Sequence, residues 1–330
     1  MKGTFTVFII QTFKIKMILL MFERSSHITL FLLTVSIVLA LNLVNLNLED
    51  RFVESAGAQW FNDTRNGIQK GIAESTNLTD GSLTVKLLAD DLGNRLNKSA
   101  AILKITGELS DVKNASYNSS ISSQIHGIPK DLDIAKRKVA NNILSYDKDL
   151  QVIFFLMPNG DMYMEEPYFR QQNLSGDNFA FRDYYKGAIN TGNTYLGNVV
   201  ISAASGLPQS YIAVPLYSSA NVNNDTLLGI WSGGVNLPVF SETLQSLNLT
   251  NGERIVYVDQ NGQKVADSNK QYFNSNQNES FSNLKAFNNA IQEQKSGSVI
   301  EMINGTRILV FYEPVQFYST TWAVLLLKPL

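Results

Sequence analysis

An arginine and two tyrosines stand at the start of a short amphipathic segment, FRDYYKGAIN, within the stretch 179–206. Apolar residues recur there at helical spacing, which predicts one buried face over 179–190. Arg182 lies beside that face, where a guanidinium can hold a carboxylate or phosphate through two hydrogen bonds. Tyr184 and Tyr185 add flat apolar walls with a polar tip. This grouping is typical of a small-molecule pocket, and a surface arginine beside core aromatics is the alternative interpretation.

The composition of the chain excludes several kinds of chemistry. The 330 residues include no cysteine and two histidines, His27 and His126, which are far apart in sequence. Thiol nucleophiles, zinc–thiolate sites and disulfides are excluded, and we expect no metal site, no cofactor and no enzymatic activity, because no nucleophile–base pair can be named. The net charge of -2 gives no basic surface for nucleic acid.

Two pairs of adjacent carboxylates occur, Asp90–Asp91 and Glu165–Glu166. Adjacent side chains on a helix or a strand point apart, whereas two catalytic carboxylates of a glycosidase must converge across a cleft. Acidic residues are mostly exposed, so the sequence predicts solvated faces for both pairs.

The segment 28–48 is predicted to be a transmembrane helix. It carries no charged residue, and about 20 apolar residues suffice to cross a bilayer. Basic residues precede it and acidic residues follow it, which places a tail of residues 1–27 in the cytoplasm and everything after about residue 50 outside the cell membrane. A cleaved signal peptide is the weaker alternative, because the apolar segment is too long for one.

Residues 49–130 are predicted to form stalk helices and a loop. Leucine and isoleucine recur at three- and four-residue steps from Leu83 to Ile105, with charges between them. Such a stalk either transmits a signal or only acts as a spacer. Asp131 then predicts the N-cap of a helix over 132–146.

A strand–turn–strand pattern occurs twice, about 100 residues apart. The apolar runs are 152–156 and 162–164 around Pro158-Asn159-Gly160-Asp161, and 255–258 and 263–266 around Gln260-Asn261-Gly262. Asn-Gly between apolar runs is a strong hairpin signal. Further strands are predicted at 196–203, 210–217, 227–237, 298–302, 307–315 and 321–327. The pattern predicts an α+β fold of two tandem PAS-like antiparallel-sheet subdomains, the first over 131–250 and the second over 251–330.

This order of features resembles the double Cache domain (dCache_1) of prokaryotic transmembrane receptors. The resemblance covers roughly residues 50–330 and depends on the segments FRDYY, ISAASG, GGVNL, FYEPV and WAVLLLKP. It implies an extracytoplasmic sensor that binds a small ligand in its membrane-distal subdomain, here the first one, and signals through the stalk. It also implies a homodimer formed through the stalk helix, with the second subdomain next to the membrane.

The amino-acid-binding branch of that family has an Arg-x-Trp-Tyr signature, followed by a strand tyrosine and two aspartates. Arg182 and Tyr185 match, and Tyr184 stands in place of the tryptophan. The strand tyrosine and the two aspartates are replaced by Val200, Ser202 and Asn236. The anions that would neutralise a ligand ammonium are therefore missing, and an unpaired buried ammonium is costly. We expect a carboxylate without an amine, or a neutral polar metabolite, as the ligand.

Six residues form the candidate ligand-binding set. They are Arg182, Tyr184, Tyr185, Ser202, Asn236 and Asp161. Arg182 is the expected anchor of an anionic group, the tyrosines are the walls and hydrogen-bond donors, and Ser202 and Asn236 make specificity contacts. Asp161 follows the first hairpin turn and could approach the pocket mouth, although turn chemistry explains it equally well.

An anchored cell-surface glycoprotein with a structural or adhesive role and no ligand is the alternative function. It is consistent with about ten N-x-S/T sequons, all after residue 50. No second membrane span or effector domain follows in this sequence, so we expect either a truncated or split receptor, or a sensor that signals through a separate partner or through the N-terminal tail.

Overall fold

The computed structural model of the chain describes residues 81–218, 226–250, 252–269 and 279–330. These residues all belong to one of the two units into which the chain divides, Ile68–Leu330. The predicted tail, the predicted transmembrane helix and the first part of the predicted stalk lie outside the described residues. Within the described ranges, no helix combines the length and the apolar character that a membrane span needs.

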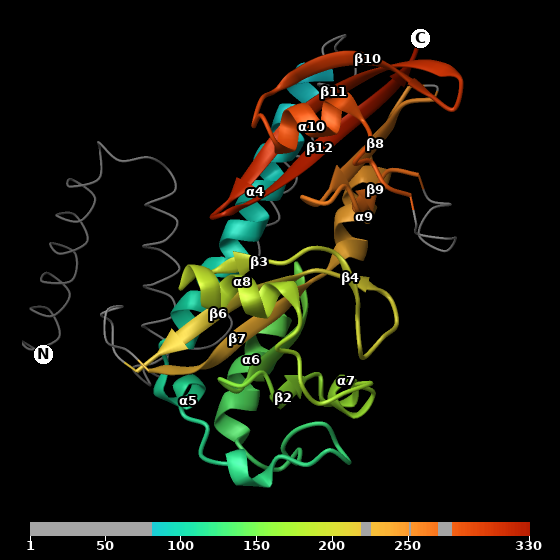
Figure 1. Ribbon diagram of the computed structural model, residues 1–330. Helices are drawn as coiled ribbons and strands as arrows, with labels where there is room; N and C mark the ends of the chain where they lie inside the picture. Colours follow the sequence, from blue (N-terminus) through green and yellow to red (C-terminus); the bar gives the residue numbers. More distant parts are fainter. Residues whose placement is uncertain (1–80, 219–225, 251, 270–278) are drawn as a thin grey trace, which may run out of the picture. The chain divides into compact units, whose positions relative to one another are not determined.

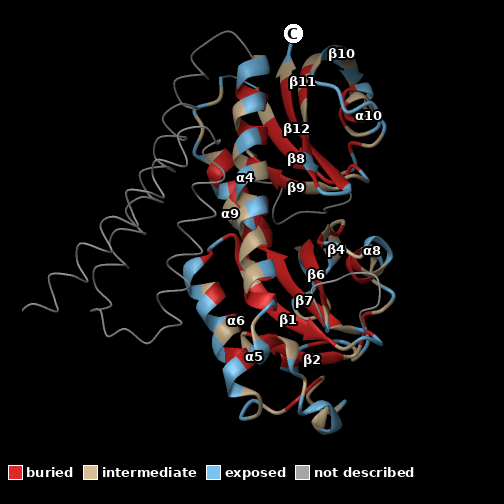
Figure 2. Ribbon diagram, turned by 90° about the vertical axis from the view of Figure 1, so that its left-hand side faces the viewer, coloured by how far each residue is buried: buried red, intermediate tan, exposed pale blue. Residues whose placement is uncertain are grey.

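Helix α4 (Gly81–Gly107) carries the apolar repeat predicted from the sequence. Its buried side chains recur at helical spacing and include Leu88, Leu92, Leu96 and Leu103. The helix packs against strands of two separate antiparallel sheets (Figures 1 and 2). An apolar stripe of this length remains buried because both sheets cover it.

The first sheet has the strand order β2-β1-β7-β6-β3, with every neighbouring pair antiparallel. Its strands are β1 (Leu150–Leu156), β2 (Met162–Glu166), β3 (Tyr195–Leu196), β6 (Tyr211–Tyr217) and β7 (Leu227–Val235). One face packs against α4 and α6 (Ile134–Tyr146), and α8 (Asp183–Thr191) packs on the opposite face. The short elements around it are α5 (Ser110–Lys113), a 3-10 turn (Asn118–Ser120), α7 (Tyr168–Gln172), β4 (Val200–Ile201) and β5 (Pro208–Gln209).

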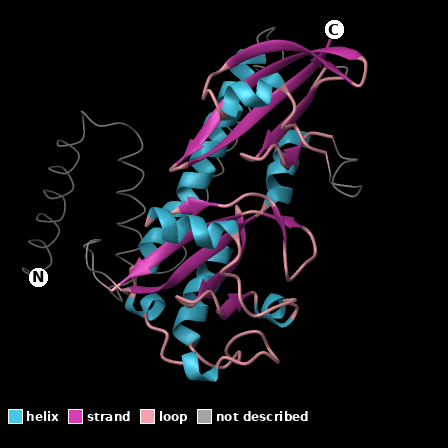
Figure 3. Cartoon of the chain, in the orientation of Figure 1, coloured by secondary structure: helices cyan, strands magenta, loops and turns pink. Residues whose placement is uncertain are grey.

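The second sheet has the order β10-β11-β12-β8-β9. Its strands are β8 (Arg254–Val258), β9 (Lys264–Asp267), β10 (Gly297–Ile303), β11 (Thr306–Phe317) and β12 (Thr320–Pro329). Helix α4 and helix α9 (Leu237–Gln245) pack on one face, and α10 (Lys285–Ile291) packs on the other. Figure 3 shows the helices and strands of both sheets. The α+β organisation with two antiparallel sheets agrees with the sequence prediction.

The two hairpins predicted from the Asn-Gly turns are confirmed, and both are built with the same bonds. Gly160 has φ 88° and Gly262 has φ 74°, a conformation that glycine adopts at little cost. The carbonyl of Gly160 accepts a hydrogen bond from the Phe179 amide, and that of Gly262 accepts one from the Phe281 amide, both at 2.8 Å. The repeat therefore extends beyond each turn into the segment that follows.

Two local predictions were wrong. Helix α6 begins after Asp133, whose side chain accepts a hydrogen bond from the Lys136 amide, so Asp131 is not the N-cap. The strand predicted over 196–203 is broken into β3 and β4. Between them, the Asn198 amide donates to an Asp183 carboxylate oxygen (2.6 Å) and the Val199 amide donates to Asp259 (2.8 Å), so side chains take the place of a neighbouring strand.

Three apolar clusters fill the interior of the part of the chain that the structure describes. The largest lies along α4 and includes residues of both sheets, among them Trp231 and Trp322, each fully buried. The Trp231 indole donates to Thr106 of α4 (3.1 Å), which joins the helix to the first sheet. The two other clusters cover the opposite faces of the first and the second sheet.

We expect Leu92→Ala to lower the free energy of unfolding by about 2–5 kcal/mol, because Leu92 is fully buried at the centre of α4. Leu83→Ala is the matched control on the same helix, since Leu83 is 40% exposed, and its effect should stay within about 0.5 kcal/mol. Urea unfolding of the full-length chain measures both values. Equal effects of the two substitutions would contradict the packing of α4 described above.

Candidate ligand-binding site

Strand β2 places two carboxylates in the interior, which corrects the prediction of a solvated face for Glu165 and Glu166. Glu165 pairs with Phe154 across the β1–β2 ladder, and Glu166 pairs with Ile153, so the two carboxylates point to opposite faces of the sheet. The sequence argument that adjacent side chains diverge is therefore right, but both faces of this strand are covered.

Each of these carboxylates has an arginine partner. Glu166 accepts a hydrogen bond from Nη1 of Arg137 (2.7 Å), which comes from α6. Glu165 accepts one from Nε of Arg170 (3.0 Å), which comes from α7. Burial of a carboxylate without such a partner would cost several kcal/mol, so the two arginines account for the presence of two acidic residues on a buried strand.

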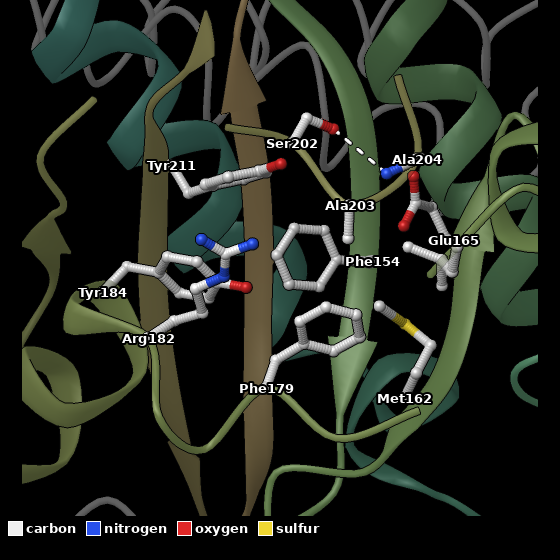
Figure 4. A pocket seen from close by; sticks show the side chains of 11 residues that line it. Phe154, Met162, Glu165, Phe179, Arg182, Tyr184, Ser202, Ala203, Ala204 and Tyr211 are labelled. Carbon is white, nitrogen blue, oxygen red and sulfur yellow. Dashed lines mark hydrogen bonds between the residues drawn. The ribbon is translucent and has the colours of Figure 1, made fainter. Parts of the chain in front are cut away.

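A cavity lies over the face of the first sheet that α8 covers, next to the side chains shown in Figure 4. Four aromatic rings line it, those of Phe154, Phe179, Tyr184 and Tyr211. The space open to the centre of a water molecule is about 10 Å³, roughly what a single water requires. The cavity is therefore narrow and mostly aromatic, with a few polar groups.

Three of the rings pack on one another. Tyr211 lies 4.8 Å from Tyr184 and 5.5 Å from Phe154 between ring centroids, with edge or tilted geometry that aromatic pairs favour. Burial raises the pKa of Tyr211 to about 12 and that of Tyr184 well above its ordinary value. Both hydroxyls therefore remain protonated at neutral pH and can donate hydrogen bonds.

Arg182 lines the cavity from the position that precedes α8. Its Nη2 donates to the backbone carbonyl of Ile201 (3.0 Å), and its guanidinium carbon lies 5.0 Å from the ring centroid of Phe181. Among the residues that the structure describes, no carboxylate forms an ion pair with Arg182. Its charge is thus available to an anion that enters the cavity.

Ser202 and Glu165 form the polar side of the cavity. The Ser202 hydroxyl accepts hydrogen bonds from Nη2 of Arg170 and from the Ala204 amide, both at 3.3 Å. Arg170 thereby connects Glu165 to the segment 202–204 that closes the cavity. Burial raises the pKa of Glu165 to about 7, although the neighbouring Arg170 opposes this rise.

The structure brings Arg182, Tyr184 and Ser202 together and places the other three candidates outside this cavity. The Tyr185 hydroxyl donates to the carbonyl of Pro158 (2.6 Å), because consecutive residues of α8 point in different directions. Asn236 precedes α9, and its side-chain amide donates to the carbonyl of Lys148 (3.0 Å). Asp161 accepts hydrogen bonds from the side chains of Asn159 and Asn178, which is the turn role considered above.

Several lining residues were missed from the sequence, chiefly Phe154, Phe179, Tyr211 and Glu165. The first hairpin contains a sequence pattern that could have identified two of them. Its register pairs Phe154 with Glu165, so the alternation of side chains along β1 and β2 places both on the same face of the sheet. Within the described ranges, no cluster of three or more acidic, histidine or cysteine side chains is placed to hold a metal ion.

The sequence of the chain matches the family profile of the Cache domain (dCache_1) over residues 64–330. The chain belongs to the Cache domain family. No curated protein sequence gives a significant match.

Three solved structures illustrate the similarity in fold. The ligand binding domain of the Pseudomonas aeruginosa PAO1 amino acid chemoreceptor PctB, in complex with L-Arg, has a TM-score of 0.50 and 13% identity, over 74% of this chain and 92% of that chain. The corresponding domain of the Pseudomonas fluorescens chemoreceptor CtaA, in complex with L-isoleucine, has a TM-score of 0.46 and 15% identity, over 81% and 95%. An extracellular ligand binding receptor from Desulfohalobium retbaense DSM5692 has a TM-score of 0.48 and 11% identity. The match covers 74% of this chain but only 40% of that receptor.

We expect the contribution of Glu165 to the free energy of unfolding to fall as the pH rises from about 4.5 to about 7. The pKa of Glu165 is raised from 4.5 to about 7 in the folded state, so the folded state binds more protons than the unfolded state in this window. The stabilising contribution of Glu165 is therefore complete below pH 4.5 and lost above pH 7. It amounts to at most about 3 kcal/mol. Glu165→Gln should remove it, so the variant should gain stability relative to the unchanged protein as the pH rises in thermal melts. A relative loss with rising pH would contradict this assignment.

Proposed function

We propose that this chain is a ligand-binding sensor and that it binds a small carboxylate in the cavity of the first subdomain. Membership of the Cache family supports the sensor class, and the similarly folded PctB domain is an amino acid chemoreceptor module. The observation that carries the ligand class is Arg182, a half-buried cation at the cavity with a backbone carbonyl as its hydrogen-bond acceptor.

The charges of the lining residues favour an anion. Glu165 and Arg170 form an ion pair, with Nε and Oε1 at 3.0 Å, and so offset each other. Arg182 then leaves the cavity with one positive charge, which a single carboxylate neutralises. An α-amino acid fits less well, because Val200 and Ser202 carry no charge and Asn236 hydrogen-bonds outside the cavity.

Binding requires the cavity to open, since its free space is about that of one water molecule. A ligand carboxylate would replace the Ile201 carbonyl as the acceptor for Arg182. The segment 202–204 would then move away from the aromatic rings. The bound and unbound states would differ in this segment, and the ligand would stabilise the open one.

The remaining parts of the proposal come from the sequence. Residues 28–48 would anchor the sensor as a single membrane helix, with the N-terminal tail in the cytoplasm and residues after about 50 outside. The stalk would join two copies as a homodimer, and a separate signalling partner would carry the output.

The narrowness of the cavity favours one other function. If the aromatic rings stay packed as they are, the subdomain is a filled scaffold, and the chain is an anchored surface glycoprotein with a structural or adhesive role. Binding experiments separate this function from the sensor.

We expect Arg182→Gln to weaken the binding of small monocarboxylates and dicarboxylates by about tenfold to a hundredfold, because a hydrogen bond to a charged group is worth about 1.5–3 kcal/mol. Lys186→Gln is the charge-matched control, since Lys186 is exposed on α8, four residues after Arg182. Thermal shift and calorimetry on the full-length chain measure the binding. Equal weakening by both substitutions, or no binding of any acid, would count against the proposed function, and the second result would favour the scaffold.

A further inference from the structure

The Glu165 carboxylate has one oxygen that the fold does not use. Its Oε1 accepts the hydrogen bond from Arg170. Among the described residues, no hydrogen bond to Oε2 is present, and Glu165 lines the cavity. A carboxylate oxygen at a cavity that has no protein donor can accept a hydrogen bond from a ligand group.

This acceptor is separated from Arg182 across the cavity. In the view of Figure 4, the ring of Phe154 lies between the guanidinium of Arg182 and the carboxylate of Glu165. The lining between these two polar ends consists of apolar groups, among them Phe154, Phe179 and Met162. A ligand that reaches both ends must therefore be extended, with an apolar middle.

We propose that the ligand is an extended carboxylate with a neutral hydroxyl at its far end, which donates a hydrogen bond to Oε2 of Glu165 while Arg182 holds the carboxylate. The inference rests on the proposed function, because it assumes that Arg182 binds the carboxylate. It adds the second end of the ligand and its chemistry.

A neutral donor fits this end better than a cation. Arg170 already supplies a full positive charge to Glu165 at 3.0 Å, and a ligand ammonium beside the same carboxylate would face that arginine. A hydroxyl satisfies the open oxygen without adding charge, and a hydrogen bond to an ionised acceptor is stronger than one between neutral groups. The total charge of the occupied cavity is then zero.

A purely structural role for Glu165 is the competing explanation. Glu166 has the same kind of bonding on the same strand: its Oε1 accepts from Arg137, and among the described residues no hydrogen bond to its Oε2 is present, but Glu166 does not line the cavity. That ion pair lies on the α6 face, away from the cavity. Glu166 is therefore the matched control for Glu165.

The test compares ω-hydroxy acids of three to six carbons with the unsubstituted acid, the 2-hydroxy isomer and the ω-amino acid of the same length, by calorimetry on the full-length chain. The measurements are made about one pH unit or more above the pKa of about 7 of Glu165, where its carboxylate is ionised. For at least one length, the ω-hydroxy acid should bind at least tenfold more tightly than the other three. Glu165→Gln should reduce this advantage to about threefold or less, because the acceptor becomes neutral. Glu166→Gln should leave it unchanged, and Arg182→Gln should weaken all the acids together.

The combined substitution Glu165→Met and Arg170→Met keeps the test decisive if Glu165→Gln does not fold, because apolar replacement of a buried ion pair is often tolerated. It should abolish the ω-hydroxy advantage and keep the binding of the unsubstituted acid. An ω-amino or 2-hydroxy acid that binds as tightly as the ω-hydroxy acid would overturn the inference and leave the proposed function in place. So would an advantage that survives the loss of Glu165. No binding of any acid would overturn both.

Discussion

The apolar stripe of α4 is the packing constraint on which the two sheets depend. Each sheet needs cover on two faces, and α4 supplies part of the cover for both through one continuous cluster that includes Trp231 and Trp322. The other face of each sheet is left to a short helix and to loops. In the first sheet, the cavity therefore lies on the face away from α4, between the strands and the segments that cover them.

The two subdomains share their turns but differ in what covers the sheet. Arg182 precedes α8 and Leu284 precedes α10. The Arg182 carbonyl accepts a hydrogen bond from the Lys186 amide, and the Leu284 carbonyl accepts one from the Asn288 amide. The position of Arg182 beside the first sheet is therefore leucine beside the second. The corresponding cluster of the second sheet consists of valine, alanine, leucine and aromatic side chains. The cluster over the second sheet is therefore apolar, whereas the cavity over the first sheet is lined in part by Arg182 and Glu165.

The sequence predicts the parts of this structure that local patterns determine. Asn-Gly turns between apolar runs gave both hairpins, and helical spacing put Tyr184 in the interior beside Arg182. It could not predict the burial of Glu165, because part of the cover comes from the segment 202–204, far from it in the chain, although its partner Arg170 is only five residues away. The family pattern predicts Asn236 at the site, but a residue at the end of a strand can match such a pattern while its side chain forms its hydrogen bond elsewhere.

The backbone between β3 and β4 is hydrogen-bonded to the second hairpin, far from it in sequence. Asp259 is fully buried in the turn of the second hairpin, and it accepts hydrogen bonds from the amides of Asn261 and Gln263 as well as from Val199. The segment 202–204, which lines the cavity, begins three residues after Val199. A carboxylate held by two amides of its own turn is a fixed anchor, so that closing segment is tethered at its root to the second subdomain. A movement of the cavity wall that includes Val199 would therefore break or strain its hydrogen bond to Asp259 in the turn of the second hairpin.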